Sequence, residues 1–354
     1  SKIPSAGFQD NVKFRNLIIN GDMSIDQRNS GSSVTATNGG YTIDRWLTGS
    51  SQSSKFTVDQ ETDAPTGFSY SVKLTSSAAT TPGASDQYWF AQNIEGFNTA
   101  YLEYGNSNAK TVTVSFHVKS SLTGTFSGSL MNSAYNYSHP FTYSISSANT
   151  WEKKSVVITG ATAGTWIGAT NGVGIRMYFS LGNGSNFLGT AGSWSASQNN
   201  GATGETQLVG TSGATLFITG VQLEAGTTAS DFEFLPHDVN KNRCLRYYYV
   251  HGEGTNKTLG SGGYYNNTYV ICTLQFPQEM RSVPSLVKTT GTDYYGIYSN
   301  NTLDHFNDFN NGIQNATTTI CAIEVSVGVS GTAGNFGRVV TRNASSLIAF
   351  NAEL

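Results

Sequence analysis

One stretch of the chain, residues 111–119, alternates apolar and polar side chains without interruption. The apolar members are Val112, Val114, Phe116 and Val118. A period of two is that of a β-strand with one face in a core and the other in water, and it excludes an amphipathic helix. His117 falls on the polar face, so we expect it at the surface. The pattern predicts a sheet with one buried face, the unit from which a β-sandwich is built.

The composition extends this expectation to the whole chain. Its 354 residues include 39 Gly, 18 Tyr and 19 Phe, and only 12% are charged. Long helices need runs of Ala, Leu, Glu and Lys, which are few here, whereas aromatic residues among Gly, Ser and Asn favour short strands joined by turns. The predicted fold class is therefore all-β.

Strand patterns recur along the first two thirds of the chain. Besides 111–119, they fall at residues 16–20, 43–49, 71–75, 88–94, 126–131, 155–159, 174–181 and 216–224. Gly220 interrupts the apolar parity of the last strand, which indicates a β-bulge. About nine strands with Gly, Ser and Asn turns predict a jelly-roll sandwich over residues 16–235, preceded by an N-terminal arm at 1–15. The polar region 182–213 is expected to be a long surface loop.

Pro236 marks the end of this unit, because proline continues neither a strand ladder nor a helix interior. Residues 236–246 are predicted to form a connector with one or two helical turns from Asp238, and a new strand starts at 247. Further strands are expected at 269–276, 319–329, 339–342 and 347–350. About five or six strands in 247–354 predict a smaller C-terminal β-sandwich, which oligomerisation would help to stabilise.

Charge and cysteine usage limit the partners. A net charge of −3 without a basic patch argues against nucleic acid, and no apolar run reaches the length of a membrane span. Cys244, Cys272 and Cys321 lack the paired spacing of a metal or redox site. We expect buried free thiols, which suit folding in a reducing cytoplasm, and no metal or other cofactor. A first residue of Ser indicates a fragment or processed product of a longer protein.

Five short motifs carry a resemblance to known proteins. NLIINGDM (16–23), IDRW (43–46) and ITGVQLEAG (218–226) resemble the opening and closing strands of jelly-roll modules in bacteriophage tail-fibre and related virion proteins. Those modules are in turn similar to the carbohydrate-binding modules attached to glycoside hydrolases. NRCLRYY (242–248) and FPQEMRSVP (276–284) resemble the connector and first loop of the distal domain in the same phage proteins.

The resemblance implies a virion protein that attaches a phage to a glycan on its host. It also implies a parallel homotrimer, contacts with other virion proteins through the N-terminal side, and a place on the tail fibre or another surface appendage after assembly in the host cytoplasm. Carbohydrate-binding relatives often hold a structural calcium through acidic side chains in the closing strand. This chain has Thr219 and Gly220 there, so no metal is predicted at that position.

Aromatic side chains beside Asn and Asp are the groups that a sugar-binding surface needs. The apolar face of a pyranose stacks on a ring, while amides and carboxylates bond its hydroxyls. In the distal unit the candidate ligand-binding residues are Tyr264, Tyr265, Tyr294, Tyr295, Tyr298, His305 and Phe306. In the jelly roll they are Tyr88, Trp89, Tyr135, Tyr137 and Trp194. Because tyrosine rings also pack at strand edges, some of these are expected in the core or in subunit contacts.

Catalysis needs a tighter constellation of side chains. Asp304, His305 and Asp308 are close in sequence, and two carboxylates near a His could cleave a glycoside. A loop also produces such a group by chance, and no nucleophile or zinc motif supports it. We therefore expect a non-catalytic adhesin. Two alternatives stay open, namely a purely structural head or tail decoration or adaptor protein, and a polysaccharide depolymerase.

Overall fold

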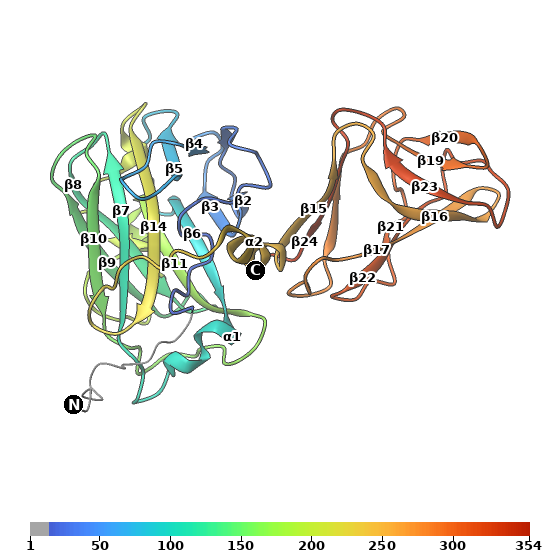
Figure 1. Cartoon of the computed structure of the whole chain (residues 1–354). Coiled ribbons are helices and arrows are strands. Elements are labelled where there is room, and N and C mark those ends of the chain that lie inside the picture. Colours follow the sequence, from blue (N-terminus) through green and yellow to red (C-terminus); the bar gives the residue numbers. More distant parts are fainter. Residues whose placement is uncertain (1–13) are drawn as a thin grey trace, which may run out of the picture. The chain divides into compact units, whose positions relative to one another are not determined.

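The structure, a computed structural model, describes residues 14–354. The predicted N-terminal arm, 1–15, lies outside the described residues except for its last two. The chain divides into two compact units, the first ending at Pro236 and the second spanning His237–Leu354 (Figure 1). Both consist mainly of β-strands, which confirms the predicted all-β class.

The first unit is a sandwich of two antiparallel six-stranded sheets. Their orders are β1-β4-β5-β14-β7-β10 and β2-β3-β6-β11-β8-β9, so the chain crosses repeatedly between the sheets and the jelly-roll prediction is confirmed (Figure 1). The strands of the first sheet are β1 Val34–Thr35, β4 Phe56–Glu61, β5 Ser71–Ser76, β7 Val112–Ser120, β10 Glu152–Ile158 and β14 Thr215–Ala225. Those of the second are β2 Gly40–Ile43, β3 Trp46–Ser50, β6 Gln87–Glu95, β8 Gly124–Met131, β9 Ser138–Ile145 and β11 Val173–Asn183.

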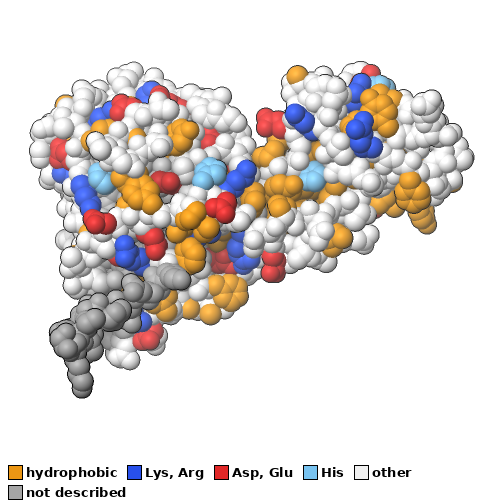
Figure 2. All heavy atoms as spheres, in the orientation of Figure 1, with side chains coloured by type: hydrophobic (Ala, Val, Ile, Leu, Met, Phe, Trp, Pro, Cys, Tyr) orange, Lys and Arg blue, Asp and Glu red, His pale blue; other side chains and the backbone are white. Residues whose placement is uncertain are grey.

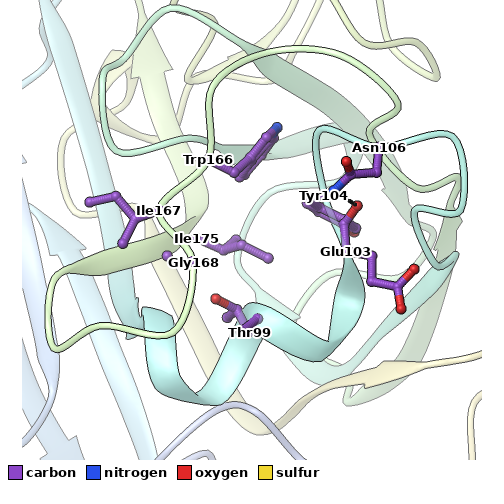
Figure 3. A pocket seen from close by; sticks show the side chains of 10 residues that line it. Thr99, Glu103, Tyr104, Asn106, Trp166, Ile167, Gly168 and Ile175 are labelled. Atoms are coloured by element: carbon purple, nitrogen blue, oxygen red, sulfur yellow. Dashed lines mark hydrogen bonds between the residues drawn. The ribbon is translucent and has the colours of Figure 1, made fainter.

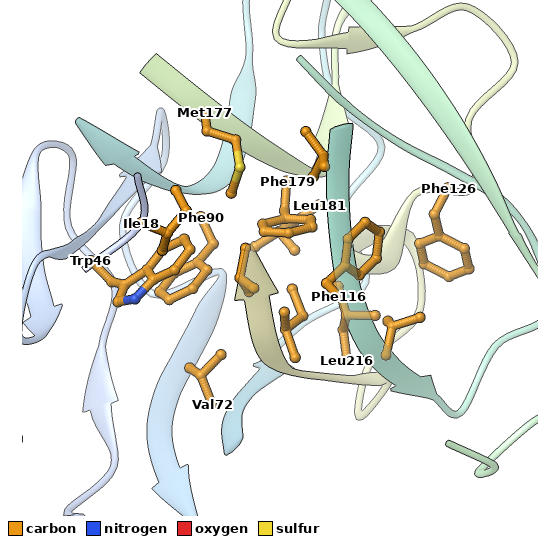
Figure 4. Packing of buried hydrophobic residues seen from close by; sticks show 14 of the residues in the cluster. Ile18, Trp46, Val72, Phe90, Phe116, Phe126, Met177, Phe179, Leu181 and Leu216 are labelled. Atoms are coloured by element: carbon orange, nitrogen blue, oxygen red, sulfur yellow. The ribbon is translucent and has the colours of Figure 1, made fainter. Parts of the chain in front are cut away.

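Aromatic side chains from both sheets fill the space between them (Figure 4). Trp46 stacks on Phe90 with 4.8 Å between ring centroids and 6° between the ring planes. Phe116 of β7 meets Phe179 of β11 edge-on at 5.0 Å. The apolar residues of the alternating stretch 111–119 are fully buried in this core, as the alternation predicted.

A hairpin replaces the single strand predicted at 43–49. β2 ends at Ile43, Asp44 and Arg45 form the turn, and β3 starts at Trp46. Arg45 adopts a left-handed backbone with a φ of 73°, which residues other than glycine seldom adopt. Its buried guanidinium donates a hydrogen bond to the carbonyl oxygen of Asn93 at 2.6 Å, so tertiary contacts hold the turn in place.

Residues 16–20, predicted as a strand, run beside β14 without joining its ladder, so this prediction is wrong. Side-chain amides take the place of ladder hydrogen bonds. Asn16 Oδ1 accepts from the N–H of Leu223 at 3.1 Å, while Gln92 bonds both the N–H and the carbonyl oxygen of Ile19 at 2.8 Å. Asn20 then turns the chain with a left-handed φ of 58°. The conformation of the NLIIN motif is therefore held largely by hydrogen bonds of buried side-chain amides.

The polar face of β7 is covered rather than wet, which corrects the expectation for residues 111–119. Ser115 and Lys119 are only 4% and 9% exposed. Phe68 lies 5.1 Å from the His117 ring, and Phe232 lies 5.2 Å from Phe68. The extended segment that follows β14 thus returns over this face. His117 is half-buried as a result, and burial lowers its pKa.

Gly220 forms the predicted β-bulge in β14. The register between β14 and β7 shifts between Thr219 and Gln222, and Gly220 has a φ of 61°. A Cβ at this position would lie 2.6 Å from the ring of Phe68, so both the backbone and the packing require glycine.

The polar stretch 182–213, predicted as a surface loop, is largely built into the sandwich. It contains two 3-10 turns and two short parallel strands, Ser185–Phe187, Leu208–Gly210, β12 Leu188–Gly189 and β13 Gly201–Ala202. Leu208 lies in the core. Glu205 accepts hydrogen bonds from the Ser180 hydroxyl at 2.6 Å and the Asn183 N–H at 3.0 Å, and burial raises its pKa. Polar residues can be buried here because they find partners.

The second unit pairs a three-stranded sheet with a seven-stranded sheet. Their orders are β15-β24-β18 and β20-β19-β23-β16-β17-β22-β21. Helix α2, His237–Leu245, opens the unit directly after Pro236. The strands of the smaller sheet are β15 Tyr248–Glu253, β18 Ser285–Lys288 and β24 Leu347–Asn351. Those of the larger are β16 Thr258–Asn266, β17 Tyr269–Gln275, β19 Tyr295–Ser299, β20 Thr302–Phe306, β21 Gly312–Gln314, β22 Ile320–Val325 and β23 Phe336–Thr341.

The strand predicted at 319–329 ends earlier than its apolar pattern suggested. Cys321 and Ile323 point into the core, but β22 stops at Val325 and the side chain of Val327 is 66% exposed. The unit also has more strands than the five or six predicted, because short strands such as β18 and β21 carry no clear alternation.

The three cysteines are buried free thiols, as predicted. Burial raises the pKa of the Cys272 thiol to about 12 and that of the Cys321 thiol to about 12. We therefore expect a thiol-reactive disulfide reagent to label no cysteine in the native chain and all of them after unfolding in urea. Absorbance of the released thiolate measures both states. Native labelling as fast as that of free cysteine would contradict the burial.

Candidate functional site

A pocket of about 220 Å³ opens beside α1 in the first unit. It is lined by Thr99, Ala100, Glu103, Tyr104, Asn106, Trp166, Ile167, Gly168, Gly174 and Ile175. In Figure 3 Trp166 and Thr99 stand on opposite sides of the pocket, with Tyr104 and Asn106 to one side and Ile167 to the other. We call this the Trp166 pocket.

Two loops that are distant in sequence build the Trp166 pocket. The first follows β6 and contains α1 and a 3-10 turn, Gly96–Thr99 and Ala100–Leu102. The second, 159–172, connects β10 to β11. The N–H of Gly96 donates to the carbonyl oxygen of Gly172 at 2.8 Å, and the N–H of Gly105 donates to that of Ala161 at 2.7 Å. Backbone hydrogen bonds therefore join the two loops directly.

Aromatic contacts fix the indole of Trp166. Its ring meets Tyr104 edge-on at 4.9 Å and lies perpendicular to Trp194 at 5.5 Å. Trp194 is in turn stacked on Tyr137, with 5.6 Å between centroids and 5° between planes. The indole N–H of Trp166 donates to the carbonyl oxygen of Ala163 at 3.0 Å. The indole is thus oriented before any ligand arrives, and it remains only half-buried.

Polar groups lie beside this ring. The hydroxyl oxygen of Tyr104 is buried and has no hydrogen-bond partner among the described residues, and burial raises the pKa of Tyr104. Asn106 and Glu103 are exposed, and the amide of Asn106 donates to the backbone carbonyl oxygen of Glu103 at 3.3 Å (Figure 3). Glu103 is the one charged residue among those that line the pocket. A molecule with an apolar face and several hydroxyl groups matches this arrangement.

Uncharged side chains and backbone cover most of the visible face of each unit, with basic and acidic side chains interspersed (Figure 2). Among residues 14–354, no three His, Cys, Asp or Glu side chains are arranged to hold a metal ion. Within the same range, no helix is both long and apolar enough to cross a membrane.

Two of the candidate residues predicted in the jelly roll adjoin the Trp166 pocket. The Trp194 ring contacts both Trp166 and Tyr104, and the Tyr137 ring stacks on Trp194. Tyr135 is 40% exposed but does not line the pocket. Its ring instead lies 4.1 Å from the guanidinium of Arg176.

The other two jelly-roll candidates, Tyr88 and Trp89, are corrected by the structure. Tyr88 is fully buried in the core between the sheets. Trp89 points to the opposite face of β6, yet it is only 7% exposed because it packs edge-on against Tyr178 at 4.8 Å. Neither ring presents a face to solvent, so neither can serve as an open stacking surface.

Three of the distal candidates are also core residues. Tyr264, Tyr295 and Phe306 are between 0% and 4% exposed. The hydroxyl of Tyr264 donates to Asp304 Oδ2 at 2.7 Å, and Tyr295 stacks on Phe306 at 5.9 Å. In a strand neighbouring side chains point to opposite faces, so Tyr264 is buried while Tyr265 is exposed. Both residues nevertheless contribute to the lining of a pocket of about 210 Å³, together with Phe336.

The remaining distal candidates are at least partly exposed but do not form one site. Tyr265 is 75% exposed and touches Tyr269, whereas Tyr298 is 38% exposed and lies against Arg338. Tyr294 and His305 are half-buried.

The possible catalytic group at 304–308 is engaged in structural contacts. Asp304 accepts hydrogen bonds from the Tyr264 hydroxyl and from the N–H of Ser330 at 2.8 Å. Asp308 forms an ion pair with Lys288 at 2.6 Å.

The residues at the centre of the Trp166 pocket were not among those predicted from the sequence, namely Glu103, Tyr104, Asn106 and Trp166 itself. One signal was present in the sequence. Trp166 lies between Gly164 and Gly168 in a turn-rich segment. No strand alternation in this segment predicts that its large ring is buried in a core.

No protein-family model and no curated protein matches this sequence. Among solved structures, the chain is similar to the enzymatically active domain of tailspike protein 4 of bacteriophage CBA120, at 16% identity and a TM-score of 0.33 over 60% of this chain and 22% of that one. It is also similar to TmCBM61 in complex with beta-1,4-galactotriose, at 10% identity and a TM-score of 0.30 over 60% of this chain and 99% of that one. A family 11 carbohydrate-binding module from Clostridium thermocellum gives 10% identity and a TM-score of 0.28 over 56% of this chain and 98% of the module.

Proposed function

We propose that the first unit binds a neutral glycan in the Trp166 pocket. The observation that carries the proposal is a half-buried indole, oriented by Tyr104 and Trp194, beside the exposed polar side chains of Asn106 and Glu103. A pyranose offers an apolar face to such a ring and hydroxyl groups to such polar side chains. A ligand hydroxyl could also supply the hydrogen bond that the buried Tyr104 hydroxyl lacks.

We infer that binding occurs without chemistry. Glycoside cleavage in most families uses a pair of carboxyl groups on either side of the scissile bond, whereas Glu103 is a single carboxylate on the rim of the pocket. In the second unit, Asp304 and Asp308 are already held by Tyr264 and Lys288. These contacts favour a structural role for both carboxylates.

The setting that we propose is a bacteriophage virion, with the chain acting as an adhesin in a tail fibre or another surface appendage. The order of the motifs at 16–23, 43–46, 218–226, 242–248 and 276–284 supports this proposal. A parallel homotrimer, joined to other virion proteins through its N-terminal side, would present three pockets to one cell. Linked sites raise overall affinity by roughly a hundredfold or more when they engage together, which suits weak single sugar contacts.

Binding of the fluorescently labelled chain to bacterial cells and to an array of bacterial polysaccharides tests this proposal. We expect it to label a subset of cells and glycans, and we expect periodate oxidation of the surface sugars to remove the label. Binding to isolated virion proteins alone, with no cell or glycan labelled, would instead support the structural adaptor. Release of reducing sugar from a bound polysaccharide would contradict the non-catalytic part.

A further inference from the structure

A second group of exposed side chains lies on the outer face of the larger sheet of the second unit. Tyr298 of β19 and Arg338 of β23 are cross-strand partners there. The guanidinium of Arg338 lies 5.1 Å from the centre of the Tyr298 ring, and that of Arg342 lies 5.9 Å from it. We call these three residues the Tyr298 cluster.

Arg342 is held in a defined position within the Tyr298 cluster. Its Nη1 donates hydrogen bonds to the Tyr298 hydroxyl at 3.2 Å and to Asn256 Oδ1. Its aliphatic stem passes over Gly296, where an added Cβ would lie 3.5 Å from Arg342 Cγ. The two hydrogen bonds hold the Arg342 guanidinium beside the Tyr298 ring before a ligand binds. Such preorganisation lowers the entropy cost of binding a ligand.

Among residues 14–354, the positive charges of the Tyr298 cluster have no acidic partner. Neither Arg338 nor Arg342 forms an ion pair with any residue between 14 and 354. His305 pairs with Gly296 in the ladder and so belongs to the same face. Arg342 Nε and His305 Nδ1 are both buried nitrogen atoms without a hydrogen-bond partner among the described residues. Two like charges beside one exposed ring thus lack the compensation that arginines usually find.

We propose that the Tyr298 cluster binds an acidic saccharide, one that carries a carboxylate or a phosphate. A guanidinium makes paired hydrogen bonds to either group, and the 38% exposed ring of Tyr298 offers a face to the sugar. A neutral sugar would leave both charges uncompensated. An anion without a sugar ring would make no contact with the face of the Tyr298 ring.

This second site goes beyond the proposed function of the first unit. It lies in the other unit, uses Arg in place of Asn and Glu, and selects for a charged ligand. It does not depend on binding at the Trp166 pocket, so the two proposals can fail separately.

Affinity electrophoresis tests the proposal by comparing how far the full chain migrates through gels that each contain one of four polymers. The probes are polygalacturonate, which carries carboxylates, a phosphorylated mannan, neutral dextran, and polyglutamate, which carries carboxylates without a sugar. We expect at least one of the two acidic polysaccharides to bind at least about tenfold more tightly than dextran and polyglutamate do. Which of the two binds will identify the acidic group.

Replacing Arg338 with Gln, alone and together with Arg342→Gln, should remove that preference. The Arg338 side chain is exposed and forms no hydrogen bond with any residue between 14 and 354, so the single variant is expected to fold. The charge-matched control is Lys241→Gln, which removes one exposed positive charge from α2 of the same unit and should leave binding unchanged. The assignment would be overturned if dextran or polyglutamate retained the chain as strongly as the acidic polysaccharides do. It would also be overturned if the Arg338→Gln, Arg342→Gln double variant bound the acidic polysaccharide as tightly as the unmodified chain.

Discussion

Replacing Trp166 with Ala is expected to weaken glycan binding by the first unit at least roughly thirtyfold, since a central aromatic contact contributes about 2 kcal/mol or more. The indole is the largest ring that lines the pocket, and Tyr104 and Trp194 already fix its orientation. Its loss removes the stacking surface and leaves polar groups that bind a sugar only weakly on their own. Isothermal titration with the glycan that binds the unmodified chain measures the effect.

Two matched variants separate a lost contact from a lost fold. Trp166→Phe keeps an aromatic face and should retain most of the affinity. Trp151→Ala makes the same truncation on a tryptophan that packs against Phe217 of β14 and does not line the pocket, so binding should be unchanged. If Trp166→Ala and Trp151→Ala lost the same amount of glycan affinity, the Trp166 pocket would not be the binding site.

Replacing Trp46 with Ala is expected to lower the free energy of unfolding of the first unit by about 3–5 kcal/mol. Trp46 is fully buried, stacks on Phe90, and donates its indole N–H to the carbonyl oxygen of Asn20 at 3.0 Å. The substitution opens a cavity in the core and leaves a buried carbonyl without this partner. It also loosens the segment at 16–20, which is held by hydrogen bonds rather than by a ladder.

Urea unfolding followed by tryptophan fluorescence measures this loss selectively. All five tryptophans lie before Pro236, so their emission reports on the first unit alone. Trp46→Phe, which keeps a ring against Phe90 but loses the hydrogen bond, should cost less than Trp46→Ala. A loss below about 1 kcal/mol for Trp46→Ala would mean that the stacked pair is not central to the core.

Periodicity predicted the parts of the fold in which a single strand has one buried face. The stretch 111–119 and the strands that became β11 and β17 were found in this way, because alternation is a local property of the sequence. Segments held by tertiary hydrogen bonds were not found. The chain at 16–20 depends on Asn16, on Gln92 from another strand, and on Leu223 from the far end of the unit. No local pattern contains that information.

The candidate site was harder to predict than the fold, for a physical reason. A composition rich in Tyr and Phe suggests stacking surfaces everywhere, but the sheet turns alternate residues inward. Tyr264 and Tyr295 therefore became core residues while Tyr265 and Tyr298 remained exposed. The Trp166 pocket needs loops from 96–106 and 159–172 to meet, and that meeting is set by backbone hydrogen bonds between them. The spacing of residues in the sequence does not predict that these two loops meet.

The indole N–H signals of the five tryptophans give the most direct test of glycan binding at the Trp166 pocket. Heteronuclear NMR of the chain, titrated with its glycan and assigned by single Trp→Phe variants, follows each indole separately. We expect the Trp166 signal to shift most and that of Trp194 to shift less, while those of Trp46 and Trp151 stay in place. A titration in which the chain binds the glycan but the Trp166 signal does not move would contradict this assignment of the site.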